Sequence, residues 1–118
     1  MPSIDYLQTE GVVSRDCLQY KNEIGYCTYR CDDGSVENYE KHYCKLGSMS
    51  ITTLRHDIMT EIYKNGPVMM GLVIYEDFMS YAGGIYHYTA GEEIGGHAMK
   101  AVGYGQDDTY GHYWILQN

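Results

Sequence analysis

Gly95-Gly96-His97-Ala98 decides the fold of this chain together with its last residues, Tyr113-Trp114-Ile115-Leu116-Gln117-Asn118. Apolar and aromatic residues follow the histidine and precede the asparagine, and such runs are typical of β-strands. The polar segment Asp107-Asp108-Thr109-Tyr110-Gly111 lies between the two strands and predicts a hairpin turn. In that hairpin, His97 at the head of one strand comes close to Asn118 at the end of the next.

Upstream of the hairpin, the sequence predicts one main helix. Leu54, Ile58 and Ile62 recur four residues apart, so they share one helical face. We expect this helix to begin after Thr52 or Thr53 and to end at Gly66-Pro67. A shorter helix is expected after Ser3 as its N-cap and before Gly11, and one or two helical turns over residues 76–81.

Four segments predict β-strands, and together with the helices they indicate an α+β fold. The first is apolar and partly β-branched, as a buried strand would be. The second follows a glycine pair, and the last two form the hairpin. The predicted strands are Val68 to Tyr75, Ile85 to Tyr88, His97 to Tyr104 and His112 to Leu116.

Length and composition limit the class of protein. With 118 residues, 44% of them hydrophobic, the chain suits one compact domain, which we place at residues 1–118. A net charge of −8 argues against binding nucleic acid, which requires a basic surface. No apolar run approaches the roughly 20 residues of a membrane span, so we expect no membrane partner.

The first five residues, Met1-Pro2-Ser3-Ile4-Asp5, lack the basic start and the apolar core of a secretory signal peptide. We therefore expect either a piece of a longer protein or a chain that stays in the cytosol.

Four cysteines lie in a polar region, residues 14–50, that shows no sustained periodicity. This even number fits a loop region held by disulfides. The alternative is a zinc site, because Cys27 and Cys31 have nearly the spacing of metal ligands and His42 lies beside Cys44. We favour disulfides, since a clean second pair of ligands is missing; we expect no metal and no cofactor.

Several motifs carry a resemblance to a known family. They are Asn65-Gly-Pro-Val68, Tyr75-Glu-Asp-Phe78, Tyr81-Ala-Gly-Gly-Ile-Tyr86 and Gly95-Gly-His-Ala-Met-Lys-Ala-Val-Gly-Tyr-Gly105. In these motifs the chain resembles the C-terminal half of papain-family cysteine peptidases, in particular those of the cathepsin B type. The resemblance covers roughly residues 6–118, loosely in the cysteine-rich half and tightly from residue 54 onward.

The resemblance implies a fold and a set of site residues. The fold would be the β-rich half of a papain-like peptidase, an α+β piece with an antiparallel, barrel-like sheet. His97 would be the catalytic acid and base, and Asn118 would orient its ring. Gly95 and Gly96 would line the substrate cleft, and Ala98 would contribute to the pocket for the residue two before the scissile bond.

The catalytic cysteine is not among the residues of the sequence. In papain-like peptidases it precedes the histidine by about 130–150 residues, which is farther than this sequence extends before His97. We therefore expect the nucleophile upstream of Met1, on a cysteine-bearing half or another subunit, and we expect the chain alone not to cleave peptides. The alternative is an inactive pseudopeptidase that serves as a binding or structural subunit.

The resemblance also implies disulfides, location and partners. Cys17 would pair with Cys31, whereas Cys27 would reach the missing half, pair with Cys44 or stay free. The compartment would be lysosomal, secretory or extracellular, and the substrate a peptide or protein. The two-histidine segment that accompanies exopeptidase activity in cathepsin B is not seen here, so endopeptidase activity is expected.

Overall fold

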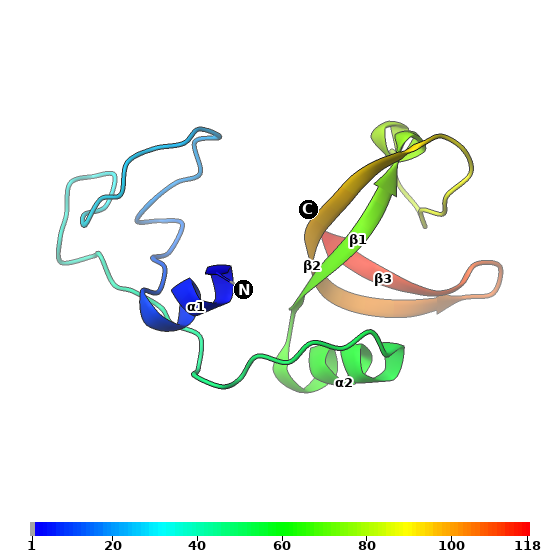
Figure 1. The fold of residues 1–118 in the computed structure, drawn as a ribbon, viewed down its shortest axis with the longest axis horizontal. Coiled ribbons are helices and arrows are strands. Elements are labelled where there is room, and N and C mark those ends of the chain that lie inside the picture. The colour runs from blue at the N-terminus through cyan, green and yellow to red at the C-terminus, as the bar shows by residue number, and fades with distance from the viewer. Residues whose placement is uncertain (1) are drawn as a thin grey trace. The chain divides into compact units, whose positions relative to one another are not determined.

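The structure is a computed structural model that describes residues 2–118. Its elements are, in order, α1 (Pro2–Thr9), α2 (Arg55–Asn65), β1 (Val68–Tyr75), the 3-10 helix η1 (Glu76–Ser80), β2 (Glu93–Asp107) and β3 (Gly111–Gln117). The chain divides into two compact units, of which the first ends at Ile51 and the second is Thr52–Asn118. Figure 1 shows the elements of both units. None of these helices is long and apolar enough to cross a membrane.

In the first unit, the expected short helix is present as α1, but Ser3 lies inside it rather than at its N-cap. Proline is favoured at the first helical position, which allows the helix to begin before Ser3. The helix ends as predicted, because Gly11 adopts a positive φ of 70° and its N–H donates to the carbonyl of Tyr6.

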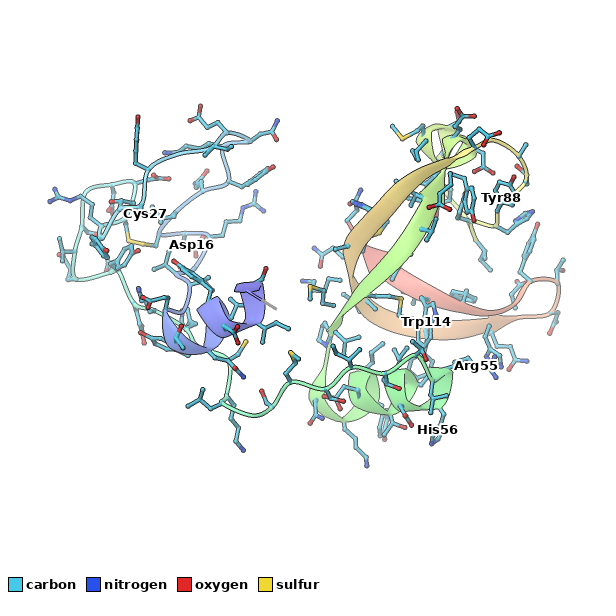
Figure 2. All side chains as sticks on the ribbon, viewed as in Figure 1. Asp16, Cys27, Arg55, His56, Tyr88 and Trp114 are labelled. Carbon is cyan, nitrogen blue, oxygen red and sulfur yellow. A yellow bond between two sulfur atoms is a disulfide. The ribbon has the colours of Figure 1, made fainter. Side chains whose placement is uncertain are left out.

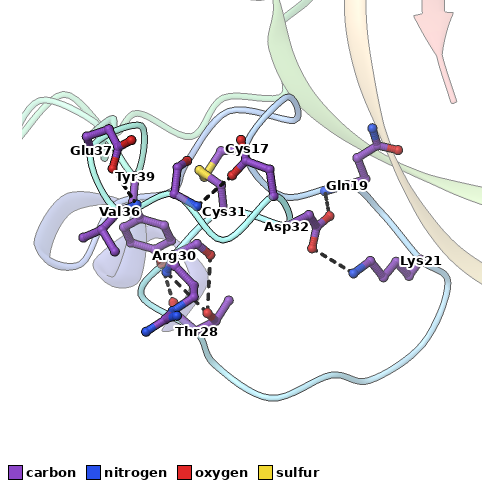
Figure 3. Close-up of a disulfide and its surroundings, with 12 residues drawn as sticks. Cys17, Gln19, Lys21, Thr28, Arg30, Cys31, Asp32, Val36, Glu37 and Tyr39 are labelled. Atoms are coloured by element: carbon purple, nitrogen blue, oxygen red, sulfur yellow. Dashed lines mark hydrogen bonds and ion pairs between the residues drawn. A yellow bond between two sulfur atoms is a disulfide. The ribbon is translucent and has the colours of Figure 1, made fainter.

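The rest of the first unit is a loop region organised by one disulfide. Cys17 and Cys31 form the disulfide that the resemblance implies, and both residues are buried. The N–H of Asp32 donates to the Cys17 carbonyl at 2.8 Å, and the Asp32 carboxylate accepts from the Lys21 ammonium at 2.8 Å. Figure 3 shows the disulfide, and beside it Asp32 between Gln19 and Lys21. The polar sequence of this region is therefore held by a covalent bond and local hydrogen bonds rather than by an apolar core.

The other two cysteines, Cys27 and Cys44, are both exposed and are not paired with each other. Because the Cys31 sulfur is bonded to Cys17, it is not available as a thiolate beside Cys27. The Cys27–Cys31 zinc site is therefore ruled out in this structure.

In the second unit, α2 matches the predicted main helix and ends at Gly66, as expected. Neither threonine is its N-cap: that position belongs to Leu54. Thr52 still supports the first turn, since its hydroxyl accepts from the Leu54 N–H at 3.1 Å and donates to the Asp57 carboxylate at 3.2 Å. An acidic side chain in the first turn also suits the helix dipole.

The second unit contains an antiparallel sheet with the strand order β1-β2-β3. α2 contacts β1 and β2. β1 has the predicted bounds, and β2 and β3 extend the two predicted hairpin strands at both ends. β2 is the longest strand: its first part pairs with β1, and from Lys100 onward it pairs with β3. It curves between these partners, which lie on either side of it (Figure 1).

The expected barrel is not closed. Within residues 2–118, β1 and β3 each pair only with β2, so both have a free edge. Small closed or nearly closed barrels need about five or more strands, and this sheet has only three. The fold is an open sheet with helices, α+β as expected.

The predicted strand at Ile85–Tyr88 is wrong, because this segment is a loop. Its β-type residues are instead used in packing: the Tyr86 ring lies 5.0 Å from Phe78 and 5.9 Å from Tyr81, measured between ring centroids. β-Propensity mainly reflects how well a side chain packs on a half-buried surface. The aromatic residues of this loop pack on such a surface although the loop pairs with no strand. The predicted turns after β1 are confirmed as η1.

Candidate active site

His97 and Asn118 lie in direct contact. His97 Nε2 is 2.8 Å from Asn118 Oδ1, and the His97 side chain is half-buried whereas Asn118 is exposed. An amide oxygen only accepts hydrogen bonds, so Nε2 carries the proton in this pair. The second ring nitrogen, Nδ1, is then left to interact with another group.

The β2–β3 hairpin brings these two residues together. Lys100 of β2 pairs with Gln117 of β3, so Asn118 continues the strand beside Met99, two residues from His97. Residues at such diagonal positions on one face lie within reach of long side chains. The register of β2 and β3 shifts between Ala101 and Gly103. This shift sets which residues of the two strands face each other, and so it places Asn118 beside Met99.

The hairpin turn lies where the sequence predicts it, and Asp107 fixes its conformation. Its carboxylate accepts from the N–H groups of Thr109 and Tyr110, at 2.8 and 2.9 Å, and these bonds lower the pKa of Asp107. Gly111 then takes a positive φ of 77° where β3 begins. The contact between His97 and Asn118 therefore depends on a turn whose chemistry is visible in the sequence.

Gly95 and Gly96 come directly before His97 on β2 and pair with Ile74 and Val73 of β1. Gly95 has a φ of 136°, which side-chain-bearing residues rarely adopt. Gly96 has no such constraint, and no atom lies within 4 Å of the position that its Cβ would occupy. The packing of the described residues therefore does not require a glycine at position 96.

Ala98 lies on the opposite side of β2 from His97 and borders a surface depression of about 410 Å³. Met69 and Val68 form part of its apolar wall, and Lys100 and Gln117 supply polar groups. A depression of this kind can take a side chain with an apolar stem.

The sequence did not identify one hydrogen-bonded cluster, which connects η1 to the loop before β2. Asp77, in η1, accepts hydrogen bonds from the Tyr86 hydroxyl at 2.6 Å and from the N–H of Thr89 at 2.8 Å. The bond from Tyr86 is the main cause that lowers the pKa of Asp77 to about 2, and the same bond raises the pKa of Tyr86 to about 12. The sequence indicates Asp77 only as part of the expected helical turn and of the motif Tyr75-Glu-Asp-Phe78. No local signal pairs it with Tyr86 or Thr89, because these residues come from a loop without periodicity.

The described residues contain no group of three or more histidine, cysteine or acidic side chains that could hold a metal ion. The site therefore consists of an imidazole with an amide partner, next to a strand with two glycines.

Comparison with known proteins identifies the family. A family model described as papain family cysteine protease matches residues 1–118. Cathepsin B-like protease 1 of Arabidopsis thaliana is 38% identical over 127 aligned positions, which cover 96% of this chain and 33% of that protein. Cathepsin B-like cysteine proteinase 3 of Caenorhabditis elegans is 39% identical over 119 positions, covering 86% of this chain and 31% of that protein.

A solved structure, proCathepsin B S9 from Trypanosoma congolense, has a similar fold, with a TM-score of 0.75 at 24% identity. The match covers 98% of this chain and 46% of that one. The chain thus spans about a third of the length of the two curated relatives above. On these matches, the chain belongs to the papain family of cysteine proteases, in its cathepsin B-like group.

Proposed function

We propose that this chain forms the histidine- and asparagine-bearing part of a cysteine endopeptidase site that hydrolyses peptide bonds. The observation that carries the proposal is the 2.8 Å contact between His97 Nε2 and Asn118 Oδ1. In this proposal His97 is the acid and base, and Asn118 is the residue that orients it.

The chemistry follows from the protonation of the ring. A thiol attacks a peptide carbonyl as its thiolate, and an adjacent imidazolium stabilises that thiolate. Because Nε2 is bonded to Asn118, Nδ1 is the nitrogen free to pair with a thiol and later to protonate the leaving amine. A neutral amide fixes the ring without adding the negative charge that a carboxylate would bring.

The thiol would come from a cysteine-bearing half of the same fold or from another protein subunit. Neither Cys27 nor Cys44 is proposed for this role, because each precedes His97 by far fewer residues than the roughly 130–150 that separate the catalytic cysteine and histidine in papain-like peptidases. The chain alone is then inactive towards peptides.

Substrate would bind along the start of β2. The open space above Gly96 leaves room for a peptide backbone to approach within hydrogen-bonding distance. Ala98, at the depression beside Met69 and Lys100, would contact the substrate side chain two positions before the scissile bond. Such a peptidase would act in a lysosomal, secretory or extracellular compartment, where the Cys17–Cys31 disulfide persists.

The test compares the purified chain with the same chain joined to a cysteine-bearing half. Each is mixed with a fluorogenic peptide substrate and with an epoxide probe that labels an activated cysteine. We expect labelling and turnover only in the joined protein, and a loss of about 10²–10⁴-fold in kcat when His97 is replaced by alanine. His112→Ala is the matched control, since His112 is an exposed histidine of β3 outside the site.

Two outcomes would contradict the proposal. A folded joined protein that neither labels nor turns over would indicate a pseudopeptidase that serves as a binding or structural subunit. Activity that survives His97→Ala would place the acid and base elsewhere.

A further inference from the structure

The loop between η1 and β2, residues 81–92, has no regular secondary structure, yet it leads directly into the glycine pair and His97. Two acidic residues of η1, Glu76 and Asp77, hold its second half. We call these two residues and their loop contacts the Glu76–Asp77 clamp.

Asp77 receives four hydrogen bonds from the loop. Tyr86 Oη donates to Oδ1 at 2.6 Å, and Oδ2 accepts from Thr89 N at 2.8 Å, from Thr89 Oγ1 at 2.9 Å and from Ala90 N at 3.4 Å. A carboxylate that accepts this many bonds is nearly saturated, and bonds to a charged acceptor are stronger than neutral ones. The side chain therefore fixes three loop residues at once.

Glu76 holds the next residues. Its N–H donates to the Glu92 carbonyl at 3.0 Å, and its Oε2 accepts from the Glu92 N–H at 3.2 Å. Gly91 approaches so closely that a Cβ there would lie 2.8 Å from the Glu76 Cβ. Together the two acids anchor the chain from Tyr86 to Glu92, immediately before β2.

The start of β2 needs such an anchor. β1 and β2 lose register between Ile74 and Tyr75, where Ile94 is the extra residue of a bulge. Gly95 and Gly96 follow, and neither has a side chain that could pack and hold the strand in place. Pairing with Ile74 and Val73 of β1 holds the backbone of these two glycines, and the residues before the bulge hold the end of the strand that enters the ladder.

We propose that Glu76 and Asp77 are positioning residues: by clamping residues 86–92 they fix the start of β2 and so the placement of Gly95, Gly96 and His97. The catalytic consequence rests on the function proposed above. The structural consequence, local order at residues 89–97, does not.

The experiment measures amide hydrogen exchange in the full chain and in its Asp77→Ala variant. We expect exchange at residues 89–97 to accelerate by about tenfold or more in the variant, since local opening follows the loss of local hydrogen bonds. Asp107→Ala is the matched control: Asp107 also accepts two backbone N–H groups in a loop, but at the other end of β2. It should accelerate exchange at residues 107–111 and leave residues 89–94 unchanged, because these residues lie before the part of β2 that pairs with β3.

Two further variants remove only part of the Asp77 hydrogen bonds and should accelerate exchange less than Asp77→Ala does. Asp77→Asn keeps the shape of the side chain and one of its two acceptor oxygens. With that oxygen towards Thr89 and Ala90, the amide NH2 can donate to the Tyr86 hydroxyl, and we expect this variant to restore part of the protection. Tyr86→Phe removes a single bond and should give a small acceleration, which keeps the proposal testable if Asp77→Ala fails to fold. Unchanged exchange at 89–97 in both Asp77→Ala and Tyr86→Phe would overturn the clamp.

A second readout addresses the site itself. In the protein joined to a cysteine-bearing half, Asp77→Ala should raise KM for a peptide substrate more than it lowers kcat, because the substrate-binding strand loses its position before the chemistry changes. If Asp77→Ala accelerates exchange but the joined protein has no activity, the structural role of the clamp stands and the peptidase function is rejected. If the joined protein is active and Asp77→Ala changes exchange at residues 89–97 without changing KM or kcat, the positioning role is rejected.

Discussion

At the scale of single residues, Gly96 is a position where a glycine is explained by the proposed function and not by the fold. A glycine inside a strand is less favourable than alanine by roughly 0.5–1 kcal/mol. Gly96 has an ordinary φ, and no neighbouring atom lies within 4 Å of a Cβ placed there. Neither backbone conformation nor packing in the described residues therefore explains the glycine, whereas close approach of a substrate backbone does.

Gly96→Ala should accordingly leave stability unchanged or slightly raise it, while it lowers kcat/KM for peptide hydrolysis in the protein joined to a cysteine-bearing half. Thermal unfolding and peptide turnover measure the two effects. Gly95→Ala is the comparison: its φ of 136° should make the same substitution destabilising. Full activity in Gly96→Ala would contradict a substrate contact at this position.

The site residues show which parts of the structure could be predicted from the sequence. The contact between His97 and Asn118 follows from one hairpin, and both the turn residues and the strand patterns of that hairpin are local signals. The role of Asp77 could not be predicted, because its partners Tyr86 and Thr89 come from a loop whose path no periodicity describes. The same loop produced the wrong strand at residues 85–88, since its aromatic residues pack as a cluster and not as a ladder.

At the scale of elements, the Glu76–Asp77 clamp at the start of η1 gives the second unit a defined response to acid. The hydrogen bond from Tyr86 and those from Thr89 lower the pKa of Asp77 from 3.8 to about 2. A carboxylate whose pKa is lower in the folded state stabilises the fold above its unfolded pKa, and this contribution is lost as the pH falls through the folded value. The clamp is therefore intact at pH 5 and is lost between about pH 4 and pH 2.

We expect the unfolding temperature to fall steeply in that window, and Asp77→Asn to make the fall shallower, because an amide does not titrate. Thermal denaturation followed from pH 6 to pH 2 measures the slope. Asp108→Asn serves as the control, because the Asp108 carboxylate accepts no hydrogen bond from the described residues. Equal slopes for Asp77→Asn and the unmodified chain would show that Asp77 carries little of the acid response.

In the first unit, the Cys17–Cys31 disulfide is the main element that holds a loop in place. It closes a loop between residues 14 apart in sequence and has only short-range hydrogen bonds around it. Loop-closure entropy for such a span contributes about 3 kcal/mol. Cys17→Ser with Cys31→Ser should expose the amides of Cys31 and Asp32, which bond to Ser35 and Cys17, to rapid hydrogen exchange. Retained protection would mean that the hydrogen bonds alone maintain this loop.

At the scale of the whole molecule, the described residues bury few apolar side chains. In the second unit only Met99 and Ala101 are buried hydrophobic residues, although the sheet has two apolar faces. By strand alternation one face carries four exposed hydrophobic side chains, which come from all three strands: Met69, Val73, Val102 and Ile115. A sheet face of this kind is stable in water when another layer covers it.

These four residues lie on the Ala98 side of β2, opposite His97. The proposed cysteine-bearing half would cover this face and would separately supply the nucleophile at His97, so assembly and catalysis can be measured separately. The chain alone should bind the dye ANS, which fluoresces on exposed apolar surface, and the joined protein should bind much less. A joined protein whose nucleophilic cysteine is replaced by alanine should show the same low dye binding but no labelling by the epoxide probe, because cover depends on packing and labelling on the thiolate. Dye binding that stays high in a folded, joined protein would mean that the cysteine-bearing half does not cover this face of the sheet, and labelling by the epoxide probe would then decide alone whether a thiolate is activated beside His97 and Asn118.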